Sequence, residues 1–112
     1  MTIYLIRDRA TKEQIDEMLQ ELGEYIKLAV DIERGILAGG GEFHADCESV
    51  LLEDGSEQQN IWGADWYPDA QEVTYESLIN IRPKQGNRTL EVLFPDVRVK
   101  IEEIAKNLLS NL

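Results

Sequence analysis

A stretch near the middle of the chain, GGGEFHADCESVLLEDG over residues 39–55, gathers the side chains that can do chemistry. It holds the only histidine and the only cysteine of the 112 residues, His44 and Cys47, together with Asp46 and Glu48. An imidazole beside two carboxylates can ligate a divalent metal or act as a general base. These residue types therefore allow a small metal-dependent, hydrolase-like enzyme as one hypothesis.

The spacing of these residues permits a site in either a strand or a helix. In a strand, His44, Asp46 and Glu48 would share one face, with neighbours ~6.5–7 Å apart. In a helix, His44 and Glu48 would be i, i+4 neighbours, which is also a workable metal-ligand spacing. Because residues 44–52 fit both structures, the pattern does not distinguish a metal site from a crowded polar face. We expect no cofactor, although this cluster allows a divalent metal.

The three glycines at residues 39–41 match neither of the common phosphate-binding glycine patterns. They indicate a bulge, or a point where the backbone passes close to another segment.

A second polar group lies in NIRPKQGNR, residues 80–88, which brings the first basic residues after a long acidic span. Residues 35–81 contain ten acids and no lysine or arginine. Guanidinium groups match planar oxyanions, so this turn can clamp a small anionic ligand, or it can be a solvated hairpin tip. The candidate ligand-binding residues of the two polar groups are His44, Asp46, Glu48, Asn80, Arg82, Asn87 and Arg88.

We expect these two polar groups to lie together at one end of a sheet. Asp46 and Glu48 have no local cation, and crowded carboxylates raise one another's pKa unless a positive group intervenes. Arg82 is expected to end one strand and Arg88 to begin the next. Both should therefore lie within contact distance of residues 42–48.

Apolar periodicity predicts the elements that position these groups. An apolar stripe with a Thr11–Gln14 capping box predicts a helix over about 12–22, and a second stripe after Asp96 predicts one over about 96–110. A period of two predicts antiparallel strands, with a glycine hairpin at residues 33–35. The expected strands span residues 3–7, 26–32, 36–40, 73–81 and 90–94. The predicted fold is one α+β domain, residues 1–112, with a mainly antiparallel sheet and both helices packed on one face.

Trp62 and Trp66 are four residues apart in an alternating segment, so their side chains should project from the same face. Such a pair can anchor a core. If exposed, it would instead mark a candidate interface with a protein partner or with a second copy in a homodimer.

Charge and composition limit the partners and the location. The net charge is −11, so most of the surface would repel nucleic acid and anionic membranes. The N-terminus has only a short apolar run, and one cysteine cannot form an internal disulfide, which favours a cytoplasmic location. The favoured hypothesis is a small soluble acidic binding or interaction module. The alternative is the metal-dependent enzyme built on His44, Asp46 and Glu48.

Four segments together resemble a family of uncharacterised prokaryotic proteins, a domain of unknown function. They are VDIERGILAGGGEFHADCESVLLEDGS, IWGADWYP, SLINIRPKQGNR and PDVRVKIEEI, which contain a His-Ala-Asp segment, a Trp-Gly pair and a Gly-Asn-Arg turn. The resemblance covers roughly residues 24–109. It implies no activity, substrate or cofactor.

Overall fold

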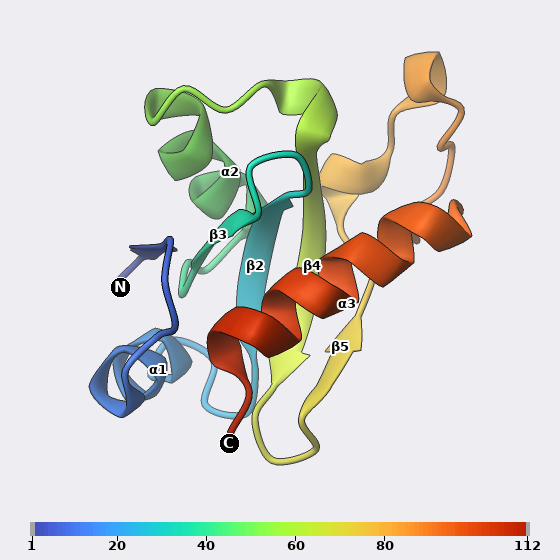
Figure 1. Cartoon of the computed structure of the whole chain (residues 1–112). Coiled ribbons are helices and arrows are strands. Elements are labelled where there is room, and N and C mark those ends of the chain that lie inside the picture. The colour runs from blue at the N-terminus through green and yellow to red at the C-terminus, as the bar shows by residue number, and fades with distance from the viewer. Residues whose placement is uncertain (1, 112) are drawn as a thin grey trace.

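The computed structural model describes residues 2–111, which form a five-stranded sheet with helices on both faces (Figure 1). The sheet order is β1-β3-β2-β4-β5, and all neighbours are antiparallel. The strands are β1 (Tyr4–Ile6), β2 (Ile26–Asp31), β3 (Ile36–Gly39), β4 (Ile61–Tyr67) and β5 (Glu72–Thr74). The helices are α1 (Lys12–Leu19), α2 (His44–Glu53) and α3 (Pro95–Leu109). The predicted α+β class with a mainly antiparallel sheet is confirmed.

The helices divide between the two faces of the sheet. Met18 of α1 and Ile101 of α3 belong to one buried apolar cluster, so these two helices share a face, as predicted. Cys47 and Leu51 of α2 belong to a second cluster on the other face. The prediction of two helices is therefore incomplete, because a third helix covers the opposite face.

Residues 44–52, which the sequence left undecided, are helical. Asp46 fixes the first turn because its carboxylate accepts a hydrogen bond from the Phe43 N–H at 3.3 Å. Helical spacing places Cys47 and Leu51 four residues apart and toward the sheet, where both are fully buried. Gly55, at a φ of 100°, turns the chain after the helix.

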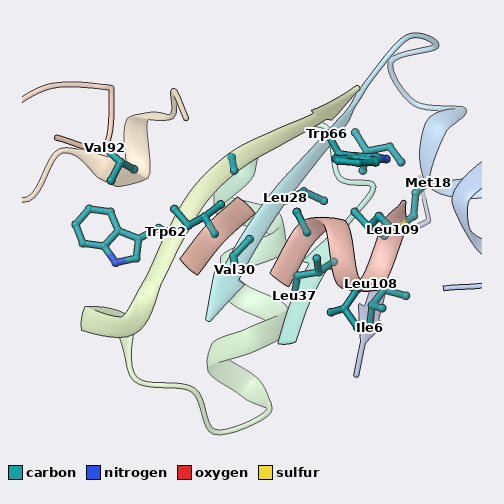
Figure 2. Packing of buried hydrophobic residues seen from close by; sticks show 14 residues of the cluster. Ile6, Met18, Leu28, Val30, Leu37, Trp62, Trp66, Val92, Leu108 and Leu109 are labelled. Carbon is teal, nitrogen blue, oxygen red and sulfur yellow. The ribbon is translucent and has the colours of Figure 1, made fainter. Parts of the chain in front are cut away.

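Trp62 and Trp66 are core residues, and their side chains appear among the buried apolar groups of Figure 2. They are 2% and 0% exposed, and they share a face of β4, as predicted. The ring of Trp62 also meets Phe94 edge-on, with the ring centroids 6.4 Å apart. The pair therefore anchors the core and does not present the exposed aromatic interface that was the other hypothesis.

Three helix boundaries differ from the predicted ones, and one of them is the end of α3, at Leu109 instead of residue 110. The first helix ends at Leu19 instead of residue 22, and the N–H of Gly23 then donates to the Leu19 carbonyl at 2.7 Å. The last helix begins at Pro95, which was expected to precede it. Proline suits the first helical position because the N–H that it lacks would have no partner there.

The glycines around β3 are required by close packing and by the turn. Gly35 has a φ of 68° and closes the predicted hairpin between β2 and β3. A Cβ on Gly40 would overlap the Thr2 carbonyl oxygen, and one on Gly39 would lie 2.9 Å from Leu28 Cδ2. The expected close approach of backbone at this glycine run is confirmed.

The strands predicted for residues 73–81 and 90–94 are wrong beyond Thr74. The chain leaves β4 there, and residues 78–80 and 83–85 form single turns of 3-10 helix. An isolated bridge joins Glu76 to Glu91, and no strand covers residues 90–94. The turn predicted at KQGNR is present, with Gly86 in the left-handed conformation.

Asn80 replaces a strand as the partner of β4. Its Oδ1 accepts a hydrogen bond from the Gly63 N–H at 2.7 Å, and its Nδ2 donates to the Gly63 carbonyl at 3.0 Å. The same amide donates to the carbonyls of Tyr75 and Leu90, both at 3.2 Å. A side chain at Gly63 would overlap Ser77, so the glycine lets this segment approach.

Asn87 also bonds backbone groups, in this case within the segment between β5 and α3, which we call the irregular segment. Its Nδ2 donates to the carbonyls of Asn80, Thr89 and Glu91, and its Oδ1 accepts from the Leu93 N–H at 2.8 Å. Asn80 and Asn87 are both candidate ligand-binding residues. They are fully buried, and their side-chain amides are committed to these hydrogen bonds with the backbone.

Within residues 2–111, each helix is too short or too polar to cross a lipid bilayer.

Candidate functional site

The three side chains of the predicted metal set leave α2 toward three different partners. His44 hydrogen-bonds to Asp65 on β4, Asp46 caps the first turn of its own helix, and Glu48 pairs with Arg82. Among the residues that the structure describes, no three His, Cys, Asp or Glu side chains gather where they could hold a metal ion. The arrangement therefore gives the metal-dependent hypothesis no ligand set.

His44 and Asp65 form a shielded pair between α2 and β4. His44 Nε2 lies 2.8 Å from Asp65 Oδ1 and 3.2 Å from the Ala64 carbonyl oxygen, and the two side chains are 12% and 11% exposed. Thr74 Oγ1 donates to the other Asp65 oxygen at 3.3 Å. Since both neighbours of Nε2 are acceptors, Nε2 carries a hydrogen, and in this tautomer of the imidazole the lone pair is on Nδ1.

Asp65 was not among the predicted site residues. The signal in the sequence is a lone acid within the mostly apolar and aromatic segment IWGADWY. A carboxylate in a strand that is buried on both faces needs a polar partner. Its partner His44 lies 21 residues earlier, so a local pattern could not identify it.

A pocket of about 450 Å³ lies beside the first turn of α2 and includes the His44–Asp65 pair in its wall. Three large apolar side chains in this wall are unusually exposed: Phe43 by 58%, Leu78 by 77% and Leu90 by 43%. The pocket is lined by Tyr25, Lys27, Phe43, His44, Ala45, Asp65, Glu76, Ser77, Leu78, Ile79 and Leu90. We call it the His44 pocket.

Several residues that line the His44 pocket are held in place by contacts with other residues. Lys27 Nζ donates to the Glu42 carbonyl at 2.9 Å and lies 5.5 Å from the centroid of the Phe43 ring. Tyr25 stacks on Tyr67 with the ring centroids 5.1 Å apart. These contacts fix the aromatic part of the wall before any ligand binds.

Arg82 joins the irregular segment to α2, as predicted. Its Nη2 lies 3.0 Å from Glu48 Oε2, and these side chains are 9% and 12% exposed. Its Nε donates to the Ile79 carbonyl at 2.9 Å, its Nη1 donates to the Gln58 carbonyl, and the guanidinium lies over the Trp62 ring. Burial lowers the pKa of Arg82, and Glu48 opposes that shift. Because these contacts are internal, Arg82 serves the fold better than it could serve an anionic ligand.

A second pocket of about 520 Å³ lies beside this ion pair and shares Leu78 and Ile79 with the His44 pocket.

The expected contact of Arg88 with residues 42–48 is not formed: its side chain is exposed, and no ion pair links it to that segment within the described chain. The predicted contact is therefore confirmed for Arg82 and wrong for Arg88.

Cys47 is expected to be unreactive in the folded protein. It is fully buried, and burial raises the pKa of its thiol to about 11. At pH 8 only about one such thiol in a thousand is ionised, and the thiolate is the reactive form. Iodoacetamide should therefore leave Cys47 unmodified in the native protein and modify it fully in denaturant, as measured by mass spectrometry. Rapid native modification would show that α2 opens from the sheet.

A family model described as "Protein of unknown function (DUF5674)" matches residues 4–108. No curated protein and no solved structure gives a significant match. The expected resemblance to a domain of unknown function is confirmed, and its motifs fall at α2, at β4 and at the turn after Arg82. Because the match covers nearly the whole chain, the protein belongs to the DUF5674 family of proteins of unknown function.

Proposed function

We propose that the protein is a binding module that holds a basic segment of a partner protein at the His44 pocket. The observation that supports this most directly is the exposure of Phe43, Leu78 and Leu90 around one concave surface. Exposed apolar side chains that gather at a pocket are typical of a contact surface for another molecule. Single exposed apolar residues would carry no such meaning.

The charge around the pocket favours a basic partner. Most of the lining residues come from the span 35–81, which has no lysine or arginine, and two of them are the acids Asp65 and Glu76. Lys27 is the one lysine or arginine in the lining, and its ammonium already has the Glu42 carbonyl as an acceptor. A net charge of −11 also increases the rate of encounter with a basic protein and lowers it for a polyanion.

Two observations support binding over catalysis. The His44–Asp65 pair resembles a general base with its orienting carboxylate, but a nucleophile is missing beside it among the described residues. Cys47 is buried against the sheet, and Ser77, which lines the pocket, accepts the Ile79 N–H at its hydroxyl. The pair is therefore better suited to recognising a ligand than to attacking one.

Selection from a displayed library of short random peptides tests the proposal. We expect enrichment of peptides that combine lysine or arginine with apolar residues, and we expect their affinity to fall with added salt. Leu78→Ser should weaken a selected peptide about tenfold because it removes apolar contact at the rim. Isothermal titration calorimetry measures this change.

Val99→Ser is the matched control. Val99 is also apolar and 54% exposed, but it lies on α3, which covers the other face of the sheet. Its substitution should leave peptide affinity unchanged. Enrichment of acidic peptides, or equal weakening by both substitutions, would contradict the proposal.

A further inference from the structure

We infer that the His44 pocket receives a single basic side chain, lysine-like or arginine-like, whose head group donates a hydrogen bond to His44 Nδ1. The inference rests on the proposed function and names the chemical group that the pocket recognises. Such recognition requires apolar surface that packs against the aliphatic stem and hydrogen-bond acceptors for the cationic head group. It also requires that the pocket does not bind an anion more strongly.

The apolar part of the wall suits the stem of such a side chain. Phe43, Leu78 and Leu90 offer apolar surface at the rim, where they remain exposed. Lysine and arginine carry three or four methylene groups that pack against apolar surface while the charged head reaches a polar group. A short apolar residue would cover the rim but would leave the polar wall of the pocket without a partner.

The polar wall offers acceptors. His44 Nε2 is committed to Asp65 and Ala64, and Nδ1, which is an acceptor in the neutral tautomer, forms no hydrogen bond within residues 2–111. Glu76, which is exposed, also lines the pocket and brings a second negative charge near it. Asp65 uses its oxygens for His44 and Thr74, yet its negative charge still attracts a cation.

Two features of the pocket would attract an anion, and both already have a partner. Lys27 Nζ donates to the Glu42 carbonyl. The N-terminus of α2 carries the Asp46 carboxylate, which accepts the Phe43 N–H. The two acids of the lining, Asp65 and Glu76, outnumber its one base, Lys27, so the charge of the wall favours a donor with positive charge.

Three small probes of similar length test this selectivity: butylguanidinium, 1-pentanol and pentanoate. Each is titrated into ¹⁵N-labelled protein, and the saturable chemical-shift changes of residues 43–45 and 76–79 are followed by NMR. We expect butylguanidinium to bind about tenfold more tightly than 1-pentanol, because hydrogen bonds between charged groups are the stronger ones. Pentanoate should give no saturable change at these residues. Equal or tighter binding of pentanoate would overturn the inference.

His44→Gln is the decisive variant. A glutamine amide can still donate to Asp65 as Nε2 does, but its acceptor, Oε1, lies at a different position from Nδ1. We expect butylguanidinium binding to fall about tenfold, 1-pentanol binding to fall by less because its donor is neutral, and the urea midpoint to stay unchanged. Glu76→Gln should also weaken butylguanidinium, whereas Lys27→Met should strengthen it. Unchanged butylguanidinium binding in His44→Gln would refute the role of Nδ1.

The outcomes separate the inference from the proposed function. If Leu78→Ser still weakens selected peptides while the probes show no preference for the cation, the binding surface stands and the basic side chain is excluded. If Leu78→Ser changes neither peptide nor 1-pentanol binding, the proposed function itself fails.

Discussion

Arg82→Ala should lower the free energy of unfolding by about 2–4 kcal/mol, because it removes one partner of a buried ion pair. Glu48 would then keep a carboxylate that is only 12% exposed and has lost its cation. The carbonyls of Ile79 and Gln58 would each lose a donor, and Trp62 would lose the guanidinium that covers it. Urea denaturation followed by far-UV circular dichroism measures the loss.

Two further variants distinguish the effect of breaking the ion pair from the effect of removing a positive charge. Arg88→Ala removes an exposed arginine from the same turn and should change the stability by less than about 0.5 kcal/mol. The double variant Arg82→Met, Glu48→Met should recover much of the loss, because apolar residues of similar size often replace a buried pair at little cost. Equal destabilisation by Arg82→Ala and Arg88→Ala would show that the turn, and not the pair, matters.

The Arg82–Glu48 contact could be predicted because it follows from charge, which acts over long separations in sequence. Thirty-four residues separate the two side chains, and no local pattern joins them. An acid-rich span without a cation, followed by the first arginine, is enough to predict such a pair. It could not choose between Arg82 and Arg88, because that choice depends on which side chain the turn directs inward.

Local patterns predicted elements wherever one physical cause dominated. Gly35 marked the hairpin because its left-handed φ excludes most other residues there, and the Thr11–Gln14 capping box fixed the start of α1. Residues 44–52 stayed undecided because Cys47 and Leu51 are compatible with both periods. The position of α2 is set by the face of the sheet that it covers, and this information lies in β2, β3 and β4.

The strands predicted after Thr74 are wrong because alternation of apolar and polar residues was their only basis. Alternation in this segment reflects alternate burial, which a strand produces but which irregular backbone can also produce. Asn80 and Asn87 point inward, and their amides supply the hydrogen bonds that a neighbouring strand would otherwise supply. Nothing local distinguishes such an amide from an exposed one.

Asn80→Ala should therefore be among the most destabilising substitutions in the chain, with an expected loss of about 3–5 kcal/mol. Asn80 is fully buried, and its amide bonds both backbone groups of Gly63 and the carbonyls of Tyr75 and Leu90. Alanine would leave these groups without partners where water cannot replace them. The urea midpoint measures the loss, and Asn107→Ala, an exposed asparagine on α3, provides the control.

Asn80→Asp separates the amide donor from the size of the side chain. Aspartate has the same shape, but as a carboxylate it offers no hydrogen to the three carbonyls that Nδ2 bonds. It should destabilise at least as much as alanine, because it also buries an unpaired charge. Relative to the parent protein, the rate of amide hydrogen exchange should then increase most at Gly63, Val92 and Leu93, where hydrogen bonds hold the irregular segment to β4 and to itself. Stability of Asn80→Asp within about 1 kcal/mol of the parent would mean that other contacts hold this segment, and the Asn80 amide would not be its link to the sheet.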